Sequence, residues 1–459
     1  MAVSPDLKSS SLWALADCNN FFCSCERLFR PDLWHRPVVV LSNNDGCVVS
    51  RSNEAKALGI KMGEPEFKIR GFLKHHKVAV FSSNYSLYSD LSSRVIRAME
   101  SLVPAVEQYS IDEAFIPLHY KALAANANEL CAALRARVLR WTGIPVSIGI
   151  GETRTLAKLA AEQAKAIQKA GKEKQSAVAR ENYIAEGVYR LMAGTAAGDK
   201  VLAGTPAGDI WGIGPHSAKR LAERSIRTAA DLVKAAQRDG EVIRRLLSVS
   251  GLRTALELTG VPCIERQPAP RQTIIASRSF GRRLSAQADI LLALAANIES
   301  AGRRLRAAKL EAQGLEVRIR TSPHTNDGRY YENAVCFDLP EATADTRLLL
   351  ETARLGLAKI FRDGWLYAKS GVLLYNLRPP GMTQLCLWAP RAADAGKAKN
   401  LMAAMDAVNR KFGAHTLRPA ILFDDEKVPG VAMRRERLSP AWTTDWQELP
   451  RVMSGKVRI

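Results

Sequence analysis

The sequence contains no long apolar run, no Cys-x-x-Cys pair and too few acidic residues to balance its basic ones. Without a stretch of about 18 apolar residues, a membrane-spanning helix is not expected. The first eleven residues lack a basic stretch followed by an apolar one, so no secretory signal is expected and the cytoplasm is the predicted location. The eight cysteines are scattered, which favours buried reduced thiols over a zinc site.

The charge balance indicates a polyanionic partner. Lys and Arg number 66 against 46 Asp and Glu, giving a net charge of +20. Nucleic acid fits this excess best, and an acidic membrane surface is the second possibility. A hydrophobic fraction of 47% in 459 residues predicts several folded domains, because single cores rarely grow beyond about 250 to 300 residues.

Two adjacent carboxylates lie in the otherwise apolar stretch 109–115, which reads YSIDEAF. Neighbouring side chains of a strand point to opposite faces, so Asp112 and Glu113 can converge only at a turn or a strand end. Asp17 follows the apolar run 12–16 and is the third candidate. Three carboxylates from two strand ends could hold two Mg²⁺ ions. The alternatives are a solvated turn at 112–113 and a helix cap at Asp17.

Basic residues accompany these acids along the chain. Lys158 and Lys165 are two turns apart on a predicted helix, so both can face the same direction. Lys56 lies on a short predicted helix, with Arg51 and Lys61 on either side. A solvated basic surface is the alternative interpretation of this last group.

A small Gly/Ala/Thr-rich duplication at 193–209 predicts a flexible junction near a domain boundary. Directly after it, Gly212 and Gly214 precede Pro215 and a helix that carries Lys219. Gly-x-Gly at the start of a helix lets backbone N–H groups approach a phosphate, as in a helix-hairpin-helix that grips the DNA backbone.

Residues 274–376 alternate in the order βαββαβ, which predicts a four-stranded sheet with two helices on one face. Four arginines fall on or beside its strands and are candidate DNA-binding residues: Arg278, Arg282, Arg318 and Arg320. A plain solvated face is the alternative. Beyond it, residues 399–412 are predicted to be helical.

Several motifs together resemble Y-family translesion DNA polymerases. They are Asp17 with Asn19 and the Phe21-Phe22 pair, and the stretch YSIDEAF. Other stretches resemble the UmuC type within that family: FRPDLW at 29–34, VVVLSNNDGCV at 38–48, EAKALG at 54–59, FSSNY at 81–85 and SRSFG at 277–281. The resemblance extends from about residue 12 to the C-terminal region.

The resemblance implies an α+β multidomain fold shaped like a right hand. Its parts would be a palm (12–30 and 81–180), fingers (31–80), a helical thumb with the helix-hairpin-helix (181–262) and a βαββαβ little finger (272–379). Residues 380–459 would form a C-terminal partner-binding tail.

It also implies roles for individual residues. Asp17, Asp112 and Glu113 would bind two Mg²⁺ ions, with the Cys18 carbonyl as a further ligand. Lys56 and Lys165 would contact the incoming triphosphate. Phe22 would be the steric gate that excludes a ribose 2′-hydroxyl, where this subgroup commonly has tyrosine. Asn53 stands where many members have a tyrosine that contacts the triphosphate.

The implied activity is error-prone, template-directed copying of damaged DNA in the SOS response, using primer-template DNA and dNTPs. The implied partners are a UmuD′-like dimer, a RecA filament and a sliding clamp, and no membrane. A clamp-binding peptide is expected at Gln384, Leu385, Leu387 and Trp388. Three other classes of protein are alternatives: a catalytically silent DNA-binding subunit, a nucleotidyl cyclase on a similar palm and a structural assembly factor. The complete acid set argues against the silent subunit, and the basic second domain argues against the cyclase.

Overall fold

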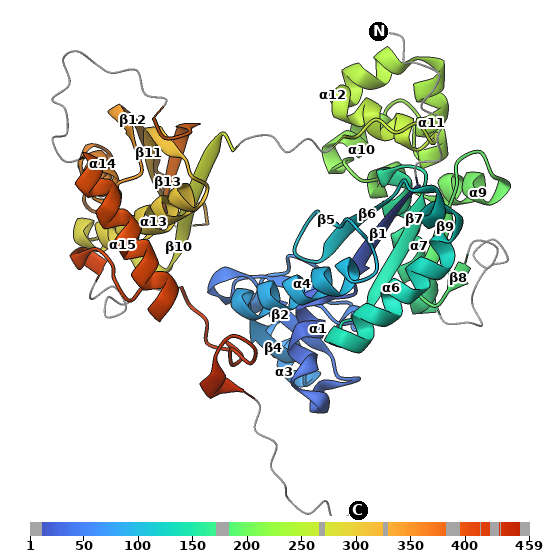
Figure 1. Cartoon of the computed structure of the whole chain (residues 1–459), viewed down its shortest axis with the longest axis horizontal. Coiled ribbons are helices and arrows are strands. Elements are labelled where there is room, and N and C mark those ends of the chain that lie inside the picture. Colours follow the sequence, from blue (N-terminus) through green and yellow to red (C-terminus); the bar gives the residue numbers. More distant parts are fainter. Residues whose placement is uncertain are drawn as a thin grey trace, which may run out of the picture. The chain divides into compact units, whose positions relative to one another are not determined.

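A computed structural model describes residues 12–170, 183–265, 271–324, 329–381, 395–413, 415–422, 431 and 433–449. The chain divides into two compact units, which are described separately. Unit 1 comprises Met1–Leu41, Cys47–Gln267 and Arg437–Ile459, and unit 2 comprises Ser42–Gly46 and Pro268–Glu436 (Figure 1). None of the described helices is both long and apolar enough to cross a membrane.

A six-stranded sheet forms the centre of unit 1. Its order is β5 (Glu107–Gln108), β6 (Glu113–Leu118), β1 (Leu12–Cys18), β7 (Val146–Gly151), β9 (Val188–Leu191) and β8 (Tyr183–Ala185). Strand β1 pairs antiparallel with both β6 and β7. All seven residues of β1 are buried, as expected for a central strand with both faces covered.

Helices cover both faces of this sheet. On one face, α4 (Tyr85–Glu100) and α6 (Ala127–Thr142) share a core with the β1 residues Ala14 and Ala16. On the other face, α7 (Arg154–Ala170) contacts Trp13 and Leu15. Helix α7 packs so close to β7 that a Cβ on Gly149 would lie 2.1 Å from the backbone of Ala157. Glycine therefore sets the position of α7, and α7 carries the two lysines noted above.

A three-stranded sheet of order β3-β2-β4 forms a second part of unit 1, built from Val48–Arg51, Val38–Leu41 and Ala79–Ser82. Helices α1 (Phe21–Leu28), α2 (Asn53–Ala57) and α3 (Glu66–His75) and the short turns η2 (Pro31–Leu33) and η3 (Asn43–Asp45) lie nearby in the sequence; η3 belongs to unit 2. The Ser52 hydroxyl caps α2 by accepting from the Ala55 amide.

The helical part of unit 1 corrects one expectation, because the duplication at 193–209 is not a flexible junction. Its residues form α9 (Ala196–Gly204) and η5 (Ala207–Asp209), and Ala197 and Leu202 are buried. The Thr195 hydroxyl caps α9 by accepting from the Gly198 amide. Small residues thus serve close packing at this place. Helices α10 (Pro215–Ala222), α11 (Ala229–Arg238) and α12 (Gly240–Glu257) follow.

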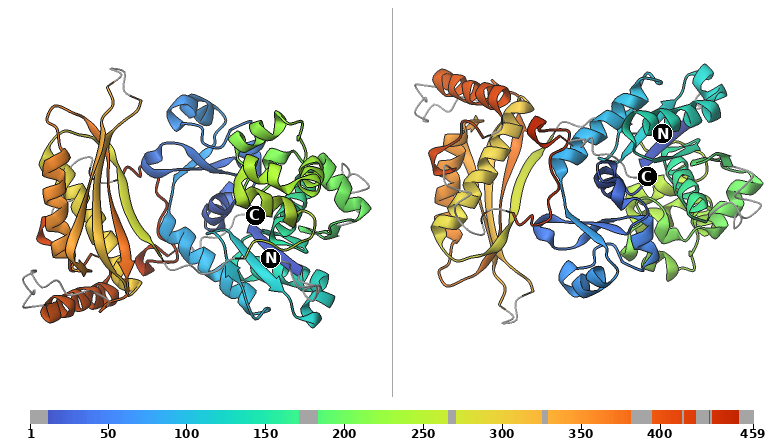
Figure 2. Two further views of the ribbon diagram at one scale, coloured as in Figure 1. Left: turned by 90° about the horizontal axis from the view of Figure 1, so that it is seen from above. Right: turned by 90° about the horizontal axis from the view of Figure 1, so that it is seen from below.

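Unit 2 confirms the predicted βαββαβ order. Its sheet has the order β10-β13-β11-β12, with strands at Thr273–Leu284, Tyr367–Arg378, Glu311–Thr321 and Glu332–Thr343. Helices α13 (Gln287–Ala307) and α14 (Thr346–Ile360) pack on one face (Figure 2).

The C-terminal region divides between the two units. Helix α15 (Ala395–Phe412), predicted at 399–412, and η6 (Ala420–Leu422) belong to unit 2, and an ion pair of 2.7 Å between Arg306 and Asp406 holds α15 to α13. Residues from Arg437 onward, including η8 (Trp446–Glu448), return to unit 1.

Candidate active site at the end of strands β1 and β6

The strand register brings the predicted acids together. Asp17 lies directly opposite Glu113 in the β1–β6 pair, and the Cys18 amide donates to the Asp112 carbonyl at 2.8 Å. Asp112 precedes the first residue of β6 and is therefore in the turn rather than in the strand. Adjacent carboxylates lie at a strand end here, as the sequence predicted.

Ser110 shapes this turn. Its hydroxyl accepts from the amide of Glu113 at 3.0 Å and donates to the Asp112 carboxylate at 2.6 Å. A short side chain that bonds its own backbone is a common way to close such a turn. Ser110 thus fixes the direction of the Asp112 carboxylate.

Two lysines of α7 hold the other two acids. The Lys165 ammonium donates to Asp17 at 2.5 Å, and the Lys158 ammonium donates to both oxygens of Glu113 at 2.7 and 2.8 Å. Glu162 also accepts from Lys165 at 2.8 Å. Lys158 and Lys165 face the same direction, as their spacing predicted.

Burial governs the electrostatics of this site. It raises the pKa of the Asp17 carboxyl to about 7, against the opposing effect of Lys165. Burial alone would lower the pKa of Lys165, but the neighbouring Asp17 and Glu162 carboxylates raise it above its ordinary value. Burial also raises the pKa of the Cys18 thiol well above its usual range, so this thiol stays protonated. Only the backbone carbonyl of Cys18 remains suitable as a ligand.

The donor set suits a divalent cation, although no three His, Cys, Asp or Glu side chains form a ready metal-binding group among the residues that the structure describes. Each acid has another contact instead: Ser110 for Asp112, Lys158 for Glu113 and Lys165 for Asp17. The ammonium groups supply the positive charge that these carboxylates require when buried. Oxygen ligands of this kind are those that Mg²⁺ prefers.

A second group of cations lies beside the acids. Lys56 donates to the Asn20 side chain at 2.6 Å, and Asn20 in turn donates to Asn53 at 3.0 Å. Burial lowers the pKa of Lys56, and the nearby charges of Arg51 and Lys165 lower it further. Cations that repel one another in this way are suited to bind a polyanion.

The predicted gate residue belongs to an aromatic cluster. The half-buried Phe22 ring stacks on Tyr88 with centroids 4.4 Å apart and an interplanar angle of 14°. Tyr85 meets Phe22 edge-on at 6.1 Å. Phe22 is the second residue of α1, and α1 begins four residues after Asp17.

The predicted helix-hairpin-helix residues lie around the start of α10. Gly212 has a φ of +84°, a conformation that favours glycine, and Gly214 is the N-cap of α10. Lys219 is exposed on that helix. Between the glycines and the acid site, the Trp211 indole donates to the Tyr109 hydroxyl at 3.3 Å.

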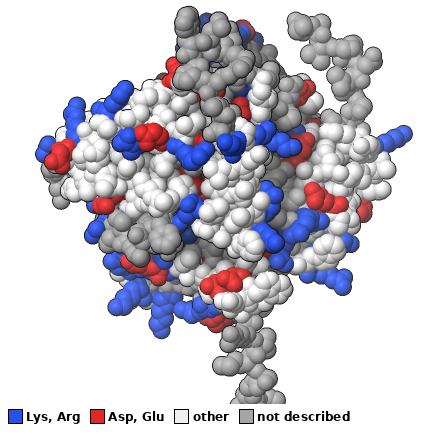
Figure 3. Space-filling model, turned by 60° about the vertical axis from the view of Figure 1, so that its left-hand side comes forward, with Lys and Arg blue, Asp and Glu red and all other residues white. Residues whose placement is uncertain are grey.

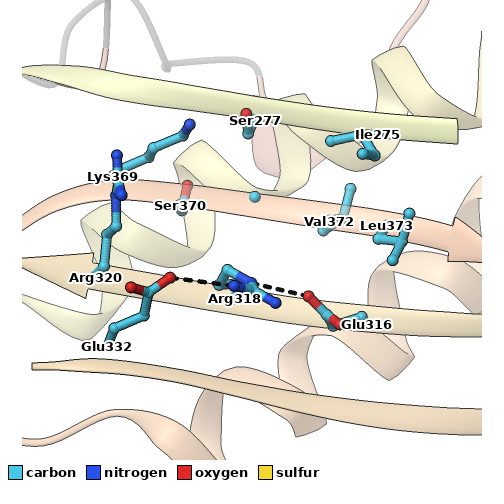
Figure 4. Close-up of a pocket in the computed structure, with 11 residues that line it drawn as sticks. Ile275, Ser277, Glu316, Arg318, Arg320, Glu332, Lys369, Ser370, Val372 and Leu373 are labelled. Carbon is cyan, nitrogen blue, oxygen red and sulfur yellow. Dashed lines mark hydrogen bonds and ion pairs between the residues drawn. The ribbon is translucent and has the colours of Figure 1, made fainter. Parts of the chain in front are cut away.

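The open face of the unit 2 sheet gathers some of the predicted arginines but not all. Arg318 and Arg320 line a shallow hollow with Lys369, Glu316 and Glu332 (Figure 4). Arg318 is neutralised locally, because it bonds Glu316 at 2.9 Å and Glu332 at 3.2 Å.

Two further predicted arginines, Arg278 and Arg282, do not line this hollow. Arg278 alternates with the exposed Ser277, so it lies on the opposite face. Arg282 falls in the irregular stretch of β10 between Ser279 and Leu284. Across the surface in Figure 3, Lys and Arg side chains form several groups with Asp and Glu between them. The predicted clamp-binding residues at 384–388 lie outside the described part of the chain.

Two residues of the acid site, Lys158 and Ser110, have no role assigned from the sequence, and neither has Arg51 beside Lys56. The spacing of Lys158 and Lys165 was a usable signal, since both lie on one helix face. Nothing local in the sequence indicated which acid each lysine would contact.

Family models match most of the chain. Residues 16–162 match the impB/mucB/samB family, residues 271–387 match the C-terminal domain of that family, and residues 399–452 match a domain of unknown function. A solved Y-family DNA polymerase chimera has a similar fold, with a TM-score of 0.61 at 19% identity over 80% of this chain and 99% of that chain. The fold is therefore that of Y-family DNA polymerases.

Relatives of known name narrow the class further. Protein UmuC of Salmonella typhimurium is 40% identical over 443 residues, covering 96% of this chain and all of that protein. Protein MucB of Escherichia coli is 38% identical over 442 residues, covering 96% and 99%. DNA polymerase IV of Pelotomaculum thermopropionicum is 26% identical, covering 89% and 94%. The chain belongs to the impB/mucB/samB family, the UmuC type of Y-family DNA polymerases.

Proposed function

We propose that this Y-family DNA polymerase performs translesion synthesis by two-metal nucleotidyl transfer at the ends of β1 and β6. The observation that carries the proposal is the register, which sets Asp17 opposite Glu113 with Asp112 in the adjoining turn. Family membership supports DNA-directed DNA synthesis, with the UmuC and MucB relatives indicating mutagenic copying in the SOS response. Divalent metal dependence is general in this class of polymerase.

In this proposal Asp17, Asp112, Glu113 and the Cys18 carbonyl hold two Mg²⁺ ions. The ions would supply Lewis acidity that lowers the pKa of the primer 3′-hydroxyl and stabilises the leaving pyrophosphate. Lys158 and Lys165 would hold the Glu113 and Asp17 carboxylates in place before the ions bind, since both ammonium groups already contact them. Lys165 is then free to turn to the triphosphate.

The incoming nucleotide would bind between the cations and the aromatic cluster. Lys56 and Lys165 would contact the triphosphate, and the proximity of Arg51 to Lys56 supports this, because it adds a third positive charge. Asn53 accepts a hydrogen bond from Asn20, and Asn20 accepts one from Lys56. Asn53 would therefore act on the triphosphate indirectly, through Lys56, at the position where other members have tyrosine. Phe22 would stack under the sugar and clash with a 2′-hydroxyl.

The right-hand division supplies the rest of the assignment. The six-stranded sheet would be the palm, the three-stranded sheet the fingers, and α9 to α12 the thumb. The β10-β13-β11-β12 sheet would be the little finger, with Arg318 and Arg320 on its open face near DNA. Gly212, Gly214 and Lys219 would contact the DNA backbone, and Arg278 and Arg282 would contact it from positions outside the hollow.

Partner proteins complete the proposal. A UmuD′-like dimer and a RecA filament would engage the region after residue 380, and a sliding clamp would bind residues 384–388. A polymerase that copies a bacterial chromosome would work in the cytoplasm. These assignments rest on the resemblance to the UmuC type.

The test is primer extension by Asp112→Ala, opposite normal and abasic templates with Mg²⁺. We expect extension to fall by at least about 10³-fold, since several kcal/mol of charge stabilisation would be lost. DNA binding should be nearly unchanged, because phosphate contacts dominate affinity. Asp32→Ala is the matched control, because Asp32 is an exposed acid of the same unit whose side chain pairs with Arg30. Extension by Asp112→Ala at the control rate would contradict the metal assignment.

A further inference from the structure

Residues 437–442 return from the end of the chain and bind along unit 1. The Ser82 amide donates to the Arg437 carbonyl at 2.9 Å, and the Arg437 amide donates to the Ser82 hydroxyl at 3.0 Å. The Arg437 guanidinium contacts Glu66 at 3.1 Å. At the other end of the segment, Trp442 stacks on Phe29 with centroids 5.4 Å apart.

Ser439, in the middle of the segment, is buried between α1 and α4. The side-chain amide of Asn84 donates to the Ser439 hydroxyl at 3.0 Å and to the Ser439 and Pro440 carbonyls at 3.1 Å. The Ser439 hydroxyl donates to Glu26 Oε1 at 3.0 Å. Glu26, Asn84 and Ser439 are 0%, 6% and 8% exposed, so water cannot readily replace these bonds.

The same glutamate oxygen holds the aromatic cluster. The Tyr88 hydroxyl donates to Glu26 Oε1 at 2.7 Å, and the Tyr88 ring is the one that stacks on Phe22. The second oxygen of Glu26, Oε2, has no hydrogen-bond partner in the described part of the chain. Ser439 and Tyr88 therefore share one acceptor.

Helix geometry makes this arrangement specific. Phe22 and Glu26 are four residues apart on α1, and Asn84 and Tyr88 are four residues apart from the N-cap of α4 onward, so each pair lies on one helix face. At one level the Phe22–Tyr88 stack joins the two helices. One turn along, Ser439 joins them through Glu26 and Asn84. Asn84 also begins α4, because its side chain accepts from the Leu87 amide.

We propose that residues 437–442 are a built-in brace that positions the Phe22–Tyr88 stack and thereby sets discrimination between deoxyribonucleotides and ribonucleotides. Ser439 is the central positioning residue of this brace. The inference assigns a role to part of the region that matches a domain of unknown function, and it rests on the proposed role of Phe22 as the steric gate.

The experiment compares single-nucleotide insertion of a dNTP and the matching rNTP by the full chain. Ser439→Ala should lower the ratio of kcat/KM for the dNTP to kcat/KM for the rNTP by about tenfold. Small misplacements near a reacting substrate can change rates by up to about 10²-fold. Ser439→Thr keeps the hydroxyl and should restore most of the ratio. Ser89→Ala is the matched control, because Ser89 is an exposed serine on the same helix α4.

Tyr88→Phe provides a second measurement should Ser439→Ala fold poorly. Tyr88→Phe keeps the stacked ring and removes the hydroxyl, so it should lower the same ratio. Tyr88→Phe combined with Ser439→Thr should match Tyr88→Phe alone. If both single changes are measurable, the effects of Tyr88→Phe and Ser439→Ala should be less than additive, because both act through Glu26 Oε1.

The outcomes separate this inference from the proposed function. Phe22→Ala is the reference for the gate. If Phe22→Ala admits ribonucleotides while Ser439→Ala and Tyr88→Phe discriminate like Ser89→Ala, the proposed role of the brace is contradicted and the role of Phe22 as the gate is retained. If Phe22→Ala leaves discrimination unchanged, the gate is elsewhere and the brace fails with it, while polymerase activity remains established by extension with dNTPs.

Discussion

The acid site of the six-stranded sheet and the open face of the four-stranded sheet differ in how exposed their charged side chains are and in how far away along the chain their partners lie. At the first, Asp17 is 6% exposed and its cation comes from a helix 148 residues away. At the second, Arg318 is 52% exposed and its acids come from its own strand and the next one. Burial makes each charge of the first site depend on its partner, whereas solvent screens the second.

This difference favours chemistry at the acid site and binding at the open sheet face. Buried charges that are held by a few partners have strong and directional fields, which suit a reacting phosphate. Exposed arginines can exchange a carboxylate for a DNA phosphate with little loss, which suits binding without sequence preference. The predictions below test this difference.

Among the changes that compare these two sites, Lys165→Ala is expected to have the largest effect. It would leave the buried Asp17 without its cation and remove a proposed triphosphate contact, so we expect kcat/KM for dNTP insertion to fall by about 10²-fold. Lys165→Arg should recover part of this loss. Lys200→Ala, which removes an exposed lysine from α9 in the same unit, is the control. Equal rates for Lys165→Ala and Lys200→Ala would show that burial gives the ion pair no catalytic importance.

A smaller effect is expected on the open sheet face. Arg320→Ala should weaken primer-template binding and reduce the slope of log affinity against log salt by about 0.9, the value for one phosphate contact. The insertion rate on saturating DNA should be unchanged. Arg318→Ala should weaken binding less, because Glu316 and Glu332 compete for its guanidinium.

Glu316→Gln extends that test in the opposite direction. It removes one acid next to Arg318, so binding to primer-template should become tighter. Fluorescence anisotropy over a range of salt concentrations measures the affinity for primer-template. An affinity that none of the three changes alters would exclude this face from the DNA interface.

Local sequence patterns predicted the parts of both regions that depend on neighbouring residues. The apolar run before Asp17 and the acids inside 109–115 predicted strand ends, and the alternation at 274–376 predicted the second sheet. The duplication at 193–209 was misread, because Gly/Ala/Thr composition is shared by linkers and by tightly packed helices such as α9.

Contacts between distant residues could not be predicted in the same way. Lys165 and Asp17 are 148 positions apart, and Ser439 and Glu26 are 413 apart. No periodicity of a single chain specifies such pairs, since they follow from how whole elements pack. The choice of face for Arg278 also depended on strand register, which was not fixed by the arginine pattern.

An effect on stability and not on catalysis or binding is expected at two buried glutamates of unit 1 that have different partners. Burial raises the pKa of Glu26 to about 7, while hydrogen bonds from Arg70 lower the pKa of Glu66. Between about pH 4.5 and 7 the folded protein binds more protons at Glu26 than the unfolded chain does, so this residue lowers the free energy of unfolding as pH rises. The loss is roughly 3 kcal/mol across that window.

Glu26→Gln should remove this loss, so the stability difference from the parent protein should grow in favour of the variant from pH 5 to pH 7.5. Glu66→Gln should instead stay less stable than the parent protein by a constant amount above about pH 5 and approach it in more acidic solution, because a carboxylate with a lowered pKa stabilises the fold above its unfolded pKa and loses that contribution in acid. Denaturant unfolding at several pH values measures both differences. Parallel pH profiles for the two variants would mean that Glu26 is ionised in the folded state, and that burial without a cation does not distinguish it from Glu66.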